Sequence, residues 1–342
     1  MLMRRFLKIS YIILFSLTLF FSKALAAATY VDSFSIHNNE GHTHGLTFSA
    51  DGTKVYVVGH GGIMVIQWIL GTAWDLSSRT AATNEHDGSI KVNTAEGTPG
   101  DPRDLKFNAD GTRMFILDRT GDAQERVYQW ELTTPWDIET ASYTIGNFFS
   151  VTDQDLQPHG FTFSPDGTKM FIIGNVSNTV FQYELTRGFD ITTASYTGNS
   201  KGLSQSGTLE GLEFSRDGTQ MFVVEAASNF SIFQYLLTTP WDIETASYTS
   251  GDSFSVQTQT ARPEEIEFSS DGSKMFVASK HGNDTIYEYT LSCYYGVVNC
   301  TDPTSDKDDV ASVEAQTESA KQLIQHTTYP VLNRMEWLRR NN

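Results

Sequence analysis

A strand, turn and strand pattern of hydrophobic and polar residues recurs along this chain. In one copy, residues 160–164 alternate between apolar and polar, Pro165-Asp166-Gly167 follows, and residues 169–173 form a second apolar run. Alternation with a period of two is typical of a β-strand, and Asp-Gly is typical of a tight turn. The pattern predicts a β-hairpin.

This hairpin occurs five times. The copies read FSADGTK, FNADGTR, FSPDGTK, FSRDGTQ and FSSDGSK, and they begin at the anchor phenylalanines Phe48, Phe107, Phe163, Phe214 and Phe268. The spacings of 59, 56, 51 and 54 residues are too long for a two-helix solenoid repeat and suit a four-stranded blade. The period therefore predicts an all-β propeller.

The sequence of each copy also predicts two further strands. A third strand is predicted at residues 179–185 in the third copy, with counterparts that end in Gln-Trp, Gln-Tyr or Glu-Tyr. The string T-T-P-W-D-I, at residues 133–138 and 238–243, predicts a turn because proline fixes the backbone there. A fourth strand such as residues 142–151 follows, so each unit supplies four strands.

The two ends of the repeat region complement each other. The fifth copy stops after its third strand near Leu291, while residues 30–36 form a strand with no hairpin of their own. We expect this N-terminal strand to complete the last blade, which closes the ring and removes an exposed sheet edge. Five blades result, with one alternative, a degenerate blade in the long spacing between Phe48 and Phe107.

The repeat resembles a known family. F-S-P-D-G-T-K-M-F, at residues 163–171, is similar to the repeat of the YVTN and WD-repeat-like bacterial propellers, and the resemblance covers residues 30–292. It implies a propeller fold. Those families include binding proteins, components of export machinery and lactone hydrolases, so the resemblance implies no single activity.

Two repeated features invite a functional interpretation. The recurring Trp and Tyr residues could stack on sugars, but their presence in every copy favours packing between blades. The recurring Asp-Gly could suggest calcium, but it lacks the D-x-D-x-D-G series of ligands and suits a turn with a positive φ at glycine.

Residues 1–26 resemble a secretory signal peptide. Arg4, Arg5 and Lys8 precede an uncharged apolar run, and Ala24-Leu25-Ala26 offers a cleavage site. The alternative is a membrane anchor, but only fourteen residues separate Lys8 from Lys23 and a spanning helix needs about 20. We expect an exported protein that is periplasmic, displayed on the cell surface or secreted.

The net charge limits which partners the protein can bind, and the cysteine content predicts a disulfide. Loss of residues 1–26 removes four basic residues and no acidic one, which moves the net charge from −17 to −21. This argues against nucleic acid and leaves a protein or glycan ligand as the expected partner, while the oligomeric state is open. Cys293 and Cys300 are the two cysteines, and export predicts a disulfide between them.

The composition changes after the repeats. We divide the chain into residues 1–26 (signal peptide), 27–300 (propeller) and 301–342 (linker and helical tail). The segment P-V-L-N-R-M-E-W-L-R-R, at residues 330–340, resembles one in large surface proteins of marine alphaproteobacteria, where it precedes an autotransporter barrel. The tail has two interpretations, contact with a membrane or partner and packing against the propeller.

The candidate site lies where the copies differ. Four residues before each anchor phenylalanine the chain carries an ionisable residue that changes from copy to copy. These residues and the ends of the predicted second strands share one face of a propeller, around its axis. The candidates are His44, Arg103, His159, Glu210 and Glu264 from the first strands, and His60, Asp118, Asn175, Glu225 and Lys280 from the second strands.

These residue types allow two interpretations. In the first, His44, His159, Glu210 and Glu264 hold a divalent metal ion, Arg103 or Lys280 positions an anionic substrate, and Glu or His acts as general acid or base. In the second, the residues form a salt-bridged rim.

Three functions follow. The leading one is an exported binding module, because the sequence holds no H-E-x-x-H helix, phosphate-binding glycine loop or four-cysteine site. The alternatives are a metal-assisted hydrolase of lactones or glycosidic bonds, with its site at the mouth of the channel, and a structural protein of an envelope or particle.

Overall fold

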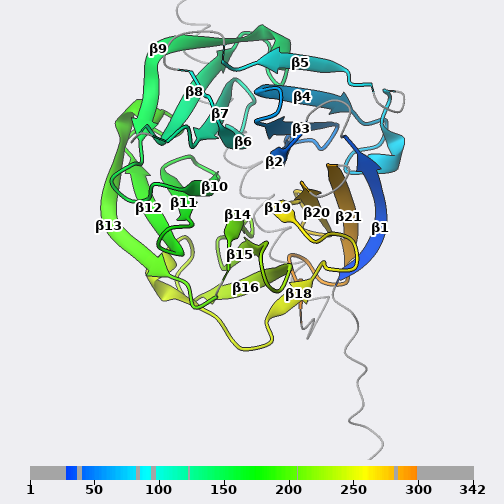
Figure 1. The fold of residues 1–342 in the computed structure, drawn as a ribbon, viewed down its shortest axis with the longest axis vertical. Helices are drawn as coiled ribbons and strands as arrows, with labels where there is room; N and C mark the ends of the chain where they lie inside the picture. Colours follow the sequence, from blue (N-terminus) through cyan, green and yellow to red (C-terminus); the bar gives the residue numbers. More distant parts are fainter. Residues whose placement is uncertain are drawn as a thin grey trace, which may run out of the picture.

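Five antiparallel sheets follow one another along the chain and surround a common axis (Figure 1). This computed structural model describes residues 28–36, 41–81, 85–93, 98–121, 124–205, 207–280 and 284–298. The predicted signal peptide and the predicted helical tail lie outside these ranges. Within the described ranges, no helix is long and apolar enough to cross a membrane.

Each blade is a short sheet whose first strand lies nearest the axis. Blade 1 consists of β2 (Thr43–Phe48), β3 (Lys54–Gly59), β4 (Met64–Ile69) and β5 (Gly88–Lys91). Blade 2 consists of β6 (Pro102–Phe107), β7 (Arg113–Asp118), β8 (Arg126–Leu132) and β9 (Ala141–Ser150). Blade 3 consists of β10 (Pro158–Phe163), β11 (Lys169–Gly174), β12 (Thr179–Leu185) and β13 (Ala194–Gly202).

The last two blades vary this plan. Blade 4 consists of β14 (Leu209–Phe214), β15 (Gln220–Glu225) and β16 (Ser231–Leu237), and two short strands, β17 (Ala246–Ser247) and β18 (Ser253–Ser255), share its outer edge. Blade 5 consists of β19 (Pro263–Phe268), β20 (Lys274–Ser279), β21 (Thr285–Leu291) and β1 (Ala28–Ser35). Short 3-10 turns follow the third strands of blades 1 to 4 at Leu76–Ser78, Ile138–Thr140, Ile191–Thr193 and Ile243–Thr245.

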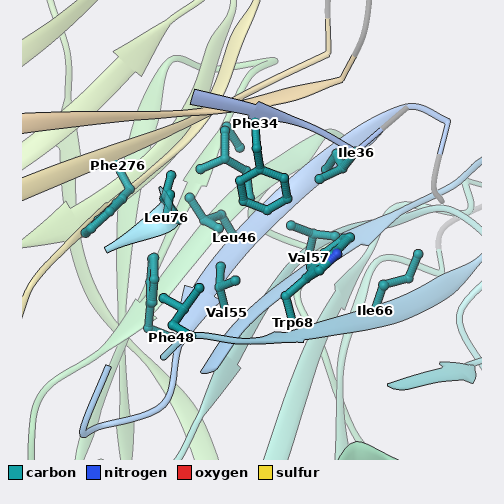
Figure 2. Packing of buried hydrophobic residues seen from close by; sticks show 13 residues of the cluster. Phe34, Ile36, Leu46, Phe48, Val55, Val57, Ile66, Trp68, Leu76 and Phe276 are labelled. Atoms are coloured by element: carbon teal, nitrogen blue, oxygen red, sulfur yellow. The ribbon is translucent and has the colours of Figure 1, made fainter. Parts of the chain in front are cut away.

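The ring closes as the sequence predicts. β1 pairs antiparallel with β21 and forms the outer strand of blade 5. Figure 2 shows the packing that accompanies this closure: Phe34 and Ile36 lie with Leu46 and Trp68 of blade 1 and with Phe276 of blade 5. Ile36 is fully buried and Phe34 is 5% exposed, so the N-terminal strand is part of the core between the first and last blades.

The Asp-Gly turns explain the most regular part of the repeat. In blade 3, Asp166 Oδ1 accepts hydrogen bonds from Ser164 Oγ (2.7 Å), Thr168 N (3.0 Å) and Thr168 Oγ1 (2.8 Å). Gly167 has a φ of +68°, and a Cβ there would lie 2.2 Å from the ring of Phe189. The turn therefore needs glycine for its backbone and for close contact with the aromatic residue of the next turn.

The aromatic residues of the third strands are core residues, as expected. Trp68, Tyr183 and Tyr289 are at most 1% exposed. The hydrophobic clusters that contain them include residues of two neighbouring blades, as in the packing of Phe171 against Phe214. Burial of these large aromatic surfaces between blades stabilises the fold.

Every innermost strand has an irregularity near its start. In β2, Thr43 is opposite Gly59 and Gly45 is opposite Val58, so His44 is the extra residue of a β-bulge. The registers of β6, β10 and β19 shift in the same way, and that of β14 shifts between Leu209 and Leu212. The bulges include the five variable residues that lie four positions before the anchor phenylalanines, and a bulge turns a side chain away from the regular alternation.

Candidate functional site

The five bulge residues, His44, Arg103, His159, Glu210 and Glu264, lie where the innermost strands begin, which we call the start face. The opposite end, with the Asp-Gly turns, is the turn face. All five bulge residues are buried, with exposed fractions between 3% and 7%. Ionisable side chains at this depth require partners, and the partners define the site.

His44 links three blades. Its Nδ1 lies 2.7 Å from Glu264 Oε2, and its Nε2 lies 2.9 Å from Arg103 Nη1. Lys280 Nζ also approaches Nε2, at 3.2 Å. A carboxylate accepts and a guanidinium donates, so His44 carries its proton on Nδ1 and accepts at Nε2.

His159 has the same arrangement on the other side of the axis. Its Nδ1 contacts Glu210 Oε2, and its Nε2 accepts from Arg119 Nη1 at 2.5 Å. The structure therefore holds two Glu–His–Arg sequences of contacts, each built from residues of three different blades.

Asp101 joins the two sequences of contacts. Its Oδ2 accepts from Arg103 Nη2 at 2.5 Å and lies 3.6 Å from Arg119 Nε. The backbone N–H of Asp101 donates to Asp118 Oδ1 at 2.7 Å, which fixes its position. A continuous series of polar contacts results, which we call the start-face network: Glu264, His44, Arg103, Asp101, Arg119, His159 and Glu210.

Positive charge gathers at the network although the protein is acidic. Four cations, Arg103, Arg119, Arg262 and Lys280, contact it together with four carboxylates, Asp101, Asp118, Glu210 and Glu264. With neutral histidines these charges balance, in a chain whose net charge is −17. The network is therefore less negative than the chain as a whole, and its cations can attract an anion.

The pKa shifts agree with this charge distribution. Burial, followed by the charges of Arg103 and Lys280, holds the pKa of His44 well below its usual value. Burial raises the pKa of Glu264, and the charge of Lys280 opposes the rise. Burial lowers the pKa of Lys280, with Glu264 opposing. The arrangement keeps His44 neutral and able to accept hydrogen bonds near neutral pH.

Three polar atoms of the network have no hydrogen-bond partner among the residues that the structure describes. They are the donor Arg103 Nε and the acceptors Asp101 Oδ1 and Glu264 Oε1. Buried polar atoms are rarely left without a partner because the loss of hydration costs about 1–3 kcal/mol each. Two of them still have a longer polar contact, because Arg262 Nε lies 3.6 Å from Glu264 Oε1 and His60 Nδ1 lies 3.6 Å from Asp101 Oδ1.

The predicted four-residue metal set divides into two pairs. His44 contacts Glu264, and His159 contacts Glu210. Within the described ranges, the ligand atoms that gather within 4.8 Å belong instead to His44, His60 and Asp101. Arg103 and Lys280 lie beside the Nε2 of His44, and two cations at this imidazole nitrogen do not fit a divalent ion.

The same geometry bears on acid–base catalysis. A Glu–His pair is the arrangement in which a histidine serves as general base. In both pairs, however, the histidine nitrogen opposite the carboxylate accepts from an arginine. Neither imidazole has a nitrogen available for a substrate proton.

Three candidates from the second strands accept hydrogen bonds from backbone N–H groups. Asp118 accepts from the N–H groups of Gly100 and Asp101, and Asn175 Oδ1 accepts from Leu209 N at 3.2 Å. The carboxylate of Glu225 accepts from four consecutive N–H groups, from Ala227 to Phe230. His60 and Lys280 do reach the network, through His44.

Comparisons with known proteins give similarity of shape only. No protein-family model matches the chain, and no curated protein matches it. One similar solved structure is a protein of unknown function from Desulfotomaculum acetoxidans, with 15% identity and a TM-score of 0.43, covering 70% of this chain. This chain spans 64% of the length of that protein.

Two further solved structures are similar. A candidate 6-phosphogluconolactonase from Bacteroides uniformis has 14% identity and a TM-score of 0.45, and the match covers 74% of this chain and 69% of that one. The β-propeller domain of Myceliophteria thermophila Cps50 (Swd1) has 9% identity and a TM-score of 0.43, with 77% of this chain and 99% of that one covered. These similarities assign no function to this chain.

Sequence reasoning misses two members of the site, Asp101 and Arg262, each of which lies two positions before a candidate residue. Arg119 directly follows the candidate Asp118 at the predicted end of a second strand. Asp101 and Arg262 both precede a proline that starts an innermost strand, at Pro102 and Pro263. A proline next to a variable position is a signal for a bulge, and it could have drawn attention to these neighbours.

Two other sequence features lie away from this site. Residues 198–202 have the spacing G-x-S-x-G, but Ser200 lies in the outer strand β13 and is exposed, not at a turn from strand to helix. Cys293 is buried and Cys300 lies outside the described residues, so their disulfide stays a prediction.

Proposed function

We propose that this protein is an exported binding protein whose start face binds a small anion that carries hydroxyl groups. The observation that supports this most is the set of buried atoms in the start-face network that have no hydrogen-bond partner among the described residues, Arg103 Nε, Asp101 Oδ1 and Glu264 Oε1. Export is inferred from the composition of residues 1–26.

Charge supports the anionic part of the ligand. Arg103 and Lys280 present donors at the axis, and an arginine binds a carboxylate or phosphate through hydrogen bonds of roughly twice the ordinary strength. Acidic residues support the hydroxyl part, because Asp101 Oδ1 and Glu264 Oε1 receive no hydrogen bond from the described residues and, when ionised, can only accept one. A ligand with a carboxylate and several hydroxyl groups satisfies both.

Catalysis is less well supported than binding. The histidines accept from arginines, and the cations beside His44 disfavour a metal ion. A hydrolase would need one of these nitrogens or a metal-bound water as its base.

Calorimetry with four probes tests the proposal. Gluconate and glycerate combine a carboxylate with hydroxyl groups, acetate has only the carboxylate, and glycerol has only the hydroxyl groups. We expect both hydroxy acids to bind at least about tenfold more tightly than acetate or glycerol, because each hydrogen bond to a charged partner contributes about 1.5–3 kcal/mol.

Two substitutions separate the roles. Lys280→Met should weaken gluconate binding about tenfold, and Glu264→Gln should lower the preference for gluconate over acetate. Lys169→Met is the matched control, since Lys169 is also a half-buried lysine but donates to Trp241 O on the turn face. Equal binding of all four probes, or an equal loss in the control, would contradict the proposal.

A further inference from the structure

The turn face has a cavity of its own on the axis, with a volume of about 500 Å³. All five blades contribute to its wall, each through its anchor phenylalanine. The half-buried rings of Trp74, Trp136 and Phe189 and the buried ring of Tyr295 extend the wall outward. The wall of the cavity is therefore rich in aromatic residues, at the opposite end of the axis from the start-face network.

The floor of this cavity is charged. The residue before each anchor phenylalanine faces the axis, and three of these five residues are Lys106, Glu213 and Glu267. Lys106 Nζ lies 3.0 Å from Glu213 Oε2 and 3.2 Å from Glu267 Oε2. Behind it, Glu265 Oε1 lies 3.8 Å away.

Carboxyl groups outnumber cations around this floor. Asp104 and Glu265 lie directly behind the lining and are at most 1% exposed. With Glu213 and Glu267 they make four carboxyls, against two cations, Lys106 and Arg216. The backbone explains part of this cluster, because Asp104 Oδ2 accepts from Phe161 N at 3.0 Å.

The excess of carboxyls shows in their pKa values. Burial raises the pKa of Asp104 to about 7, opposed by the charge of Lys106. Burial and the charge of Glu213 raise the pKa of Glu267 to about 7, again against Lys106. Burial and the charge of Asp104 hold the pKa of Glu265 well above its usual value. Protons therefore neutralise part of the cluster at neutral pH.

We propose that the turn-face cavity binds a small organic ammonium ion. Its positive charge would take the place of the protons held by the cluster, and its apolar substituents would contact the aromatic wall. Aromatic rings attract such cations through the negative faces of their π-systems, which a bare inorganic ion exploits less because it keeps its hydration. This site is independent of the anion site on the start face.

The residue before the anchor phenylalanine differs between blades, and this variation also supports a ligand site. Blades 1 and 3 have threonine at the position before the anchor, Thr47 and Thr162, while the other three have Lys or Glu. A purely structural ring needs no such asymmetry. The competing explanation is that the ion pairs of Lys106 lock blades 2, 4 and 5 together, and the experiment has to distinguish the two.

Calorimetric titration of the full chain with tetramethylammonium tests the proposal. The groups that face Glu267 are Lys106 from β6, Glu213 from β14, Thr47 from β2 and Glu265 from its own strand. As the carboxyls with a pKa of about 7 lose protons, binding should strengthen about tenfold from about pH 6 to about pH 8. Titrations in buffers of different ionisation enthalpy should show proton release below about pH 7.

Specificity and one substitution complete the test. Tetramethylammonium should bind at least about fivefold more tightly than ammonium, which has the charge without the methyl groups. Glu267→Gln should weaken binding and remove most of its pH dependence. Glu125→Gln should leave binding unchanged, because Glu125 is also a buried glutamate, 1% exposed, but its carboxylate accepts from Thr152 Oγ1 at 2.9 Å outside this cavity.

Three results would overturn the proposal. The first is the absence of tetramethylammonium binding to the unaltered chain at both pH values. The second is equal binding of ammonium and tetramethylammonium. The third is unchanged binding by a folded Glu267→Gln protein whose stability has fallen, which would make the cluster a lock between blades. The first two need no variant, so a variant that fails to fold does not remove the test.

Discussion

Single residues decide what each blade presents at the axis, because the three inner strands follow the same order in all five blades. Three positions before the anchor phenylalanine, Gly45, Gly160 and Gly211 let neighbouring innermost strands approach. A Cβ at Gly160 would lie 2.6 Å from the carbonyl oxygen of Glu210. Asp104 and Glu265 occupy the same position in the other two blades and bring carboxyls to the centre of the channel.

The turn-face cluster should make stability depend on pH. The pKa of Glu267 is raised to about 7 in the folded protein, from an ordinary value of 4.5. The folded state therefore binds more protons than the unfolded state, and this stabilisation is complete below about pH 4.5 and lost as pH rises through about 7. We expect the free energy of unfolding to fall by about 1–3 kcal/mol between about pH 5 and about pH 8.

Glu267→Gln provides the comparison for this effect, because glutamine has the same shape and does not titrate. Chemical unfolding across the same pH range should show a smaller decline for the variant than for the unaltered protein. Parallel curves for the two proteins would show that Glu267 does not titrate in this range.

At the scale of the element, the sequence determines the hairpins because their signals are local. The Asp-Gly turns, the third strands and the completing strand β1 were all predictable, and β12 has the predicted bounds, Thr179–Leu185. The five predicted bulge residues do converge on one face, while their role as a site stays a prediction. The bulges themselves, and the contacts of Asp101 with Arg119, were not predictable, because they depend on how strands distant in sequence meet.

The cavity cluster was missed for the same reason. Lys106 and Glu213 are separated by 107 residues, and nothing near either residue indicates the other. Asp118 and Glu225 were predicted as site residues because they end second strands, but they accept from backbone N–H groups. A strand end places a side chain at a face without deciding whether the chain or a ligand uses it.

The Asp-Gly turns give a test at this scale. Gly167→Ala should destabilise the protein by about 2–4 kcal/mol, because Gly167 has a φ of +68° and a Cβ there would overlap Phe189. Gly198→Ala is the control, since Gly198 has a φ of +92° with nothing within 4 Å of the added carbon, and it should cost only about 1 kcal/mol. Equal losses in thermal unfolding would show that contact with Phe189 contributes nothing.

At the scale of the whole molecule, the ring brings together residues that no single blade could hold. β1 pairs with β21, and this closure sets blade 5 beside blade 1, so that Glu264 meets His44. Residues from all five blades then contribute to the start-face network. The two ends of the axis differ in character, with balanced charges in the start-face network and an excess of carboxyls at the turn face.

The most direct test of the binding proposal is a crystal structure of the full chain with gluconate. We predict density at the start face, with the carboxylate of the ligand within hydrogen-bond distance of Arg103 or Lys280 and a hydroxyl group on Glu264 Oε1. Gluconate elsewhere, or a start face that holds only water at saturating gluconate, would contradict the account.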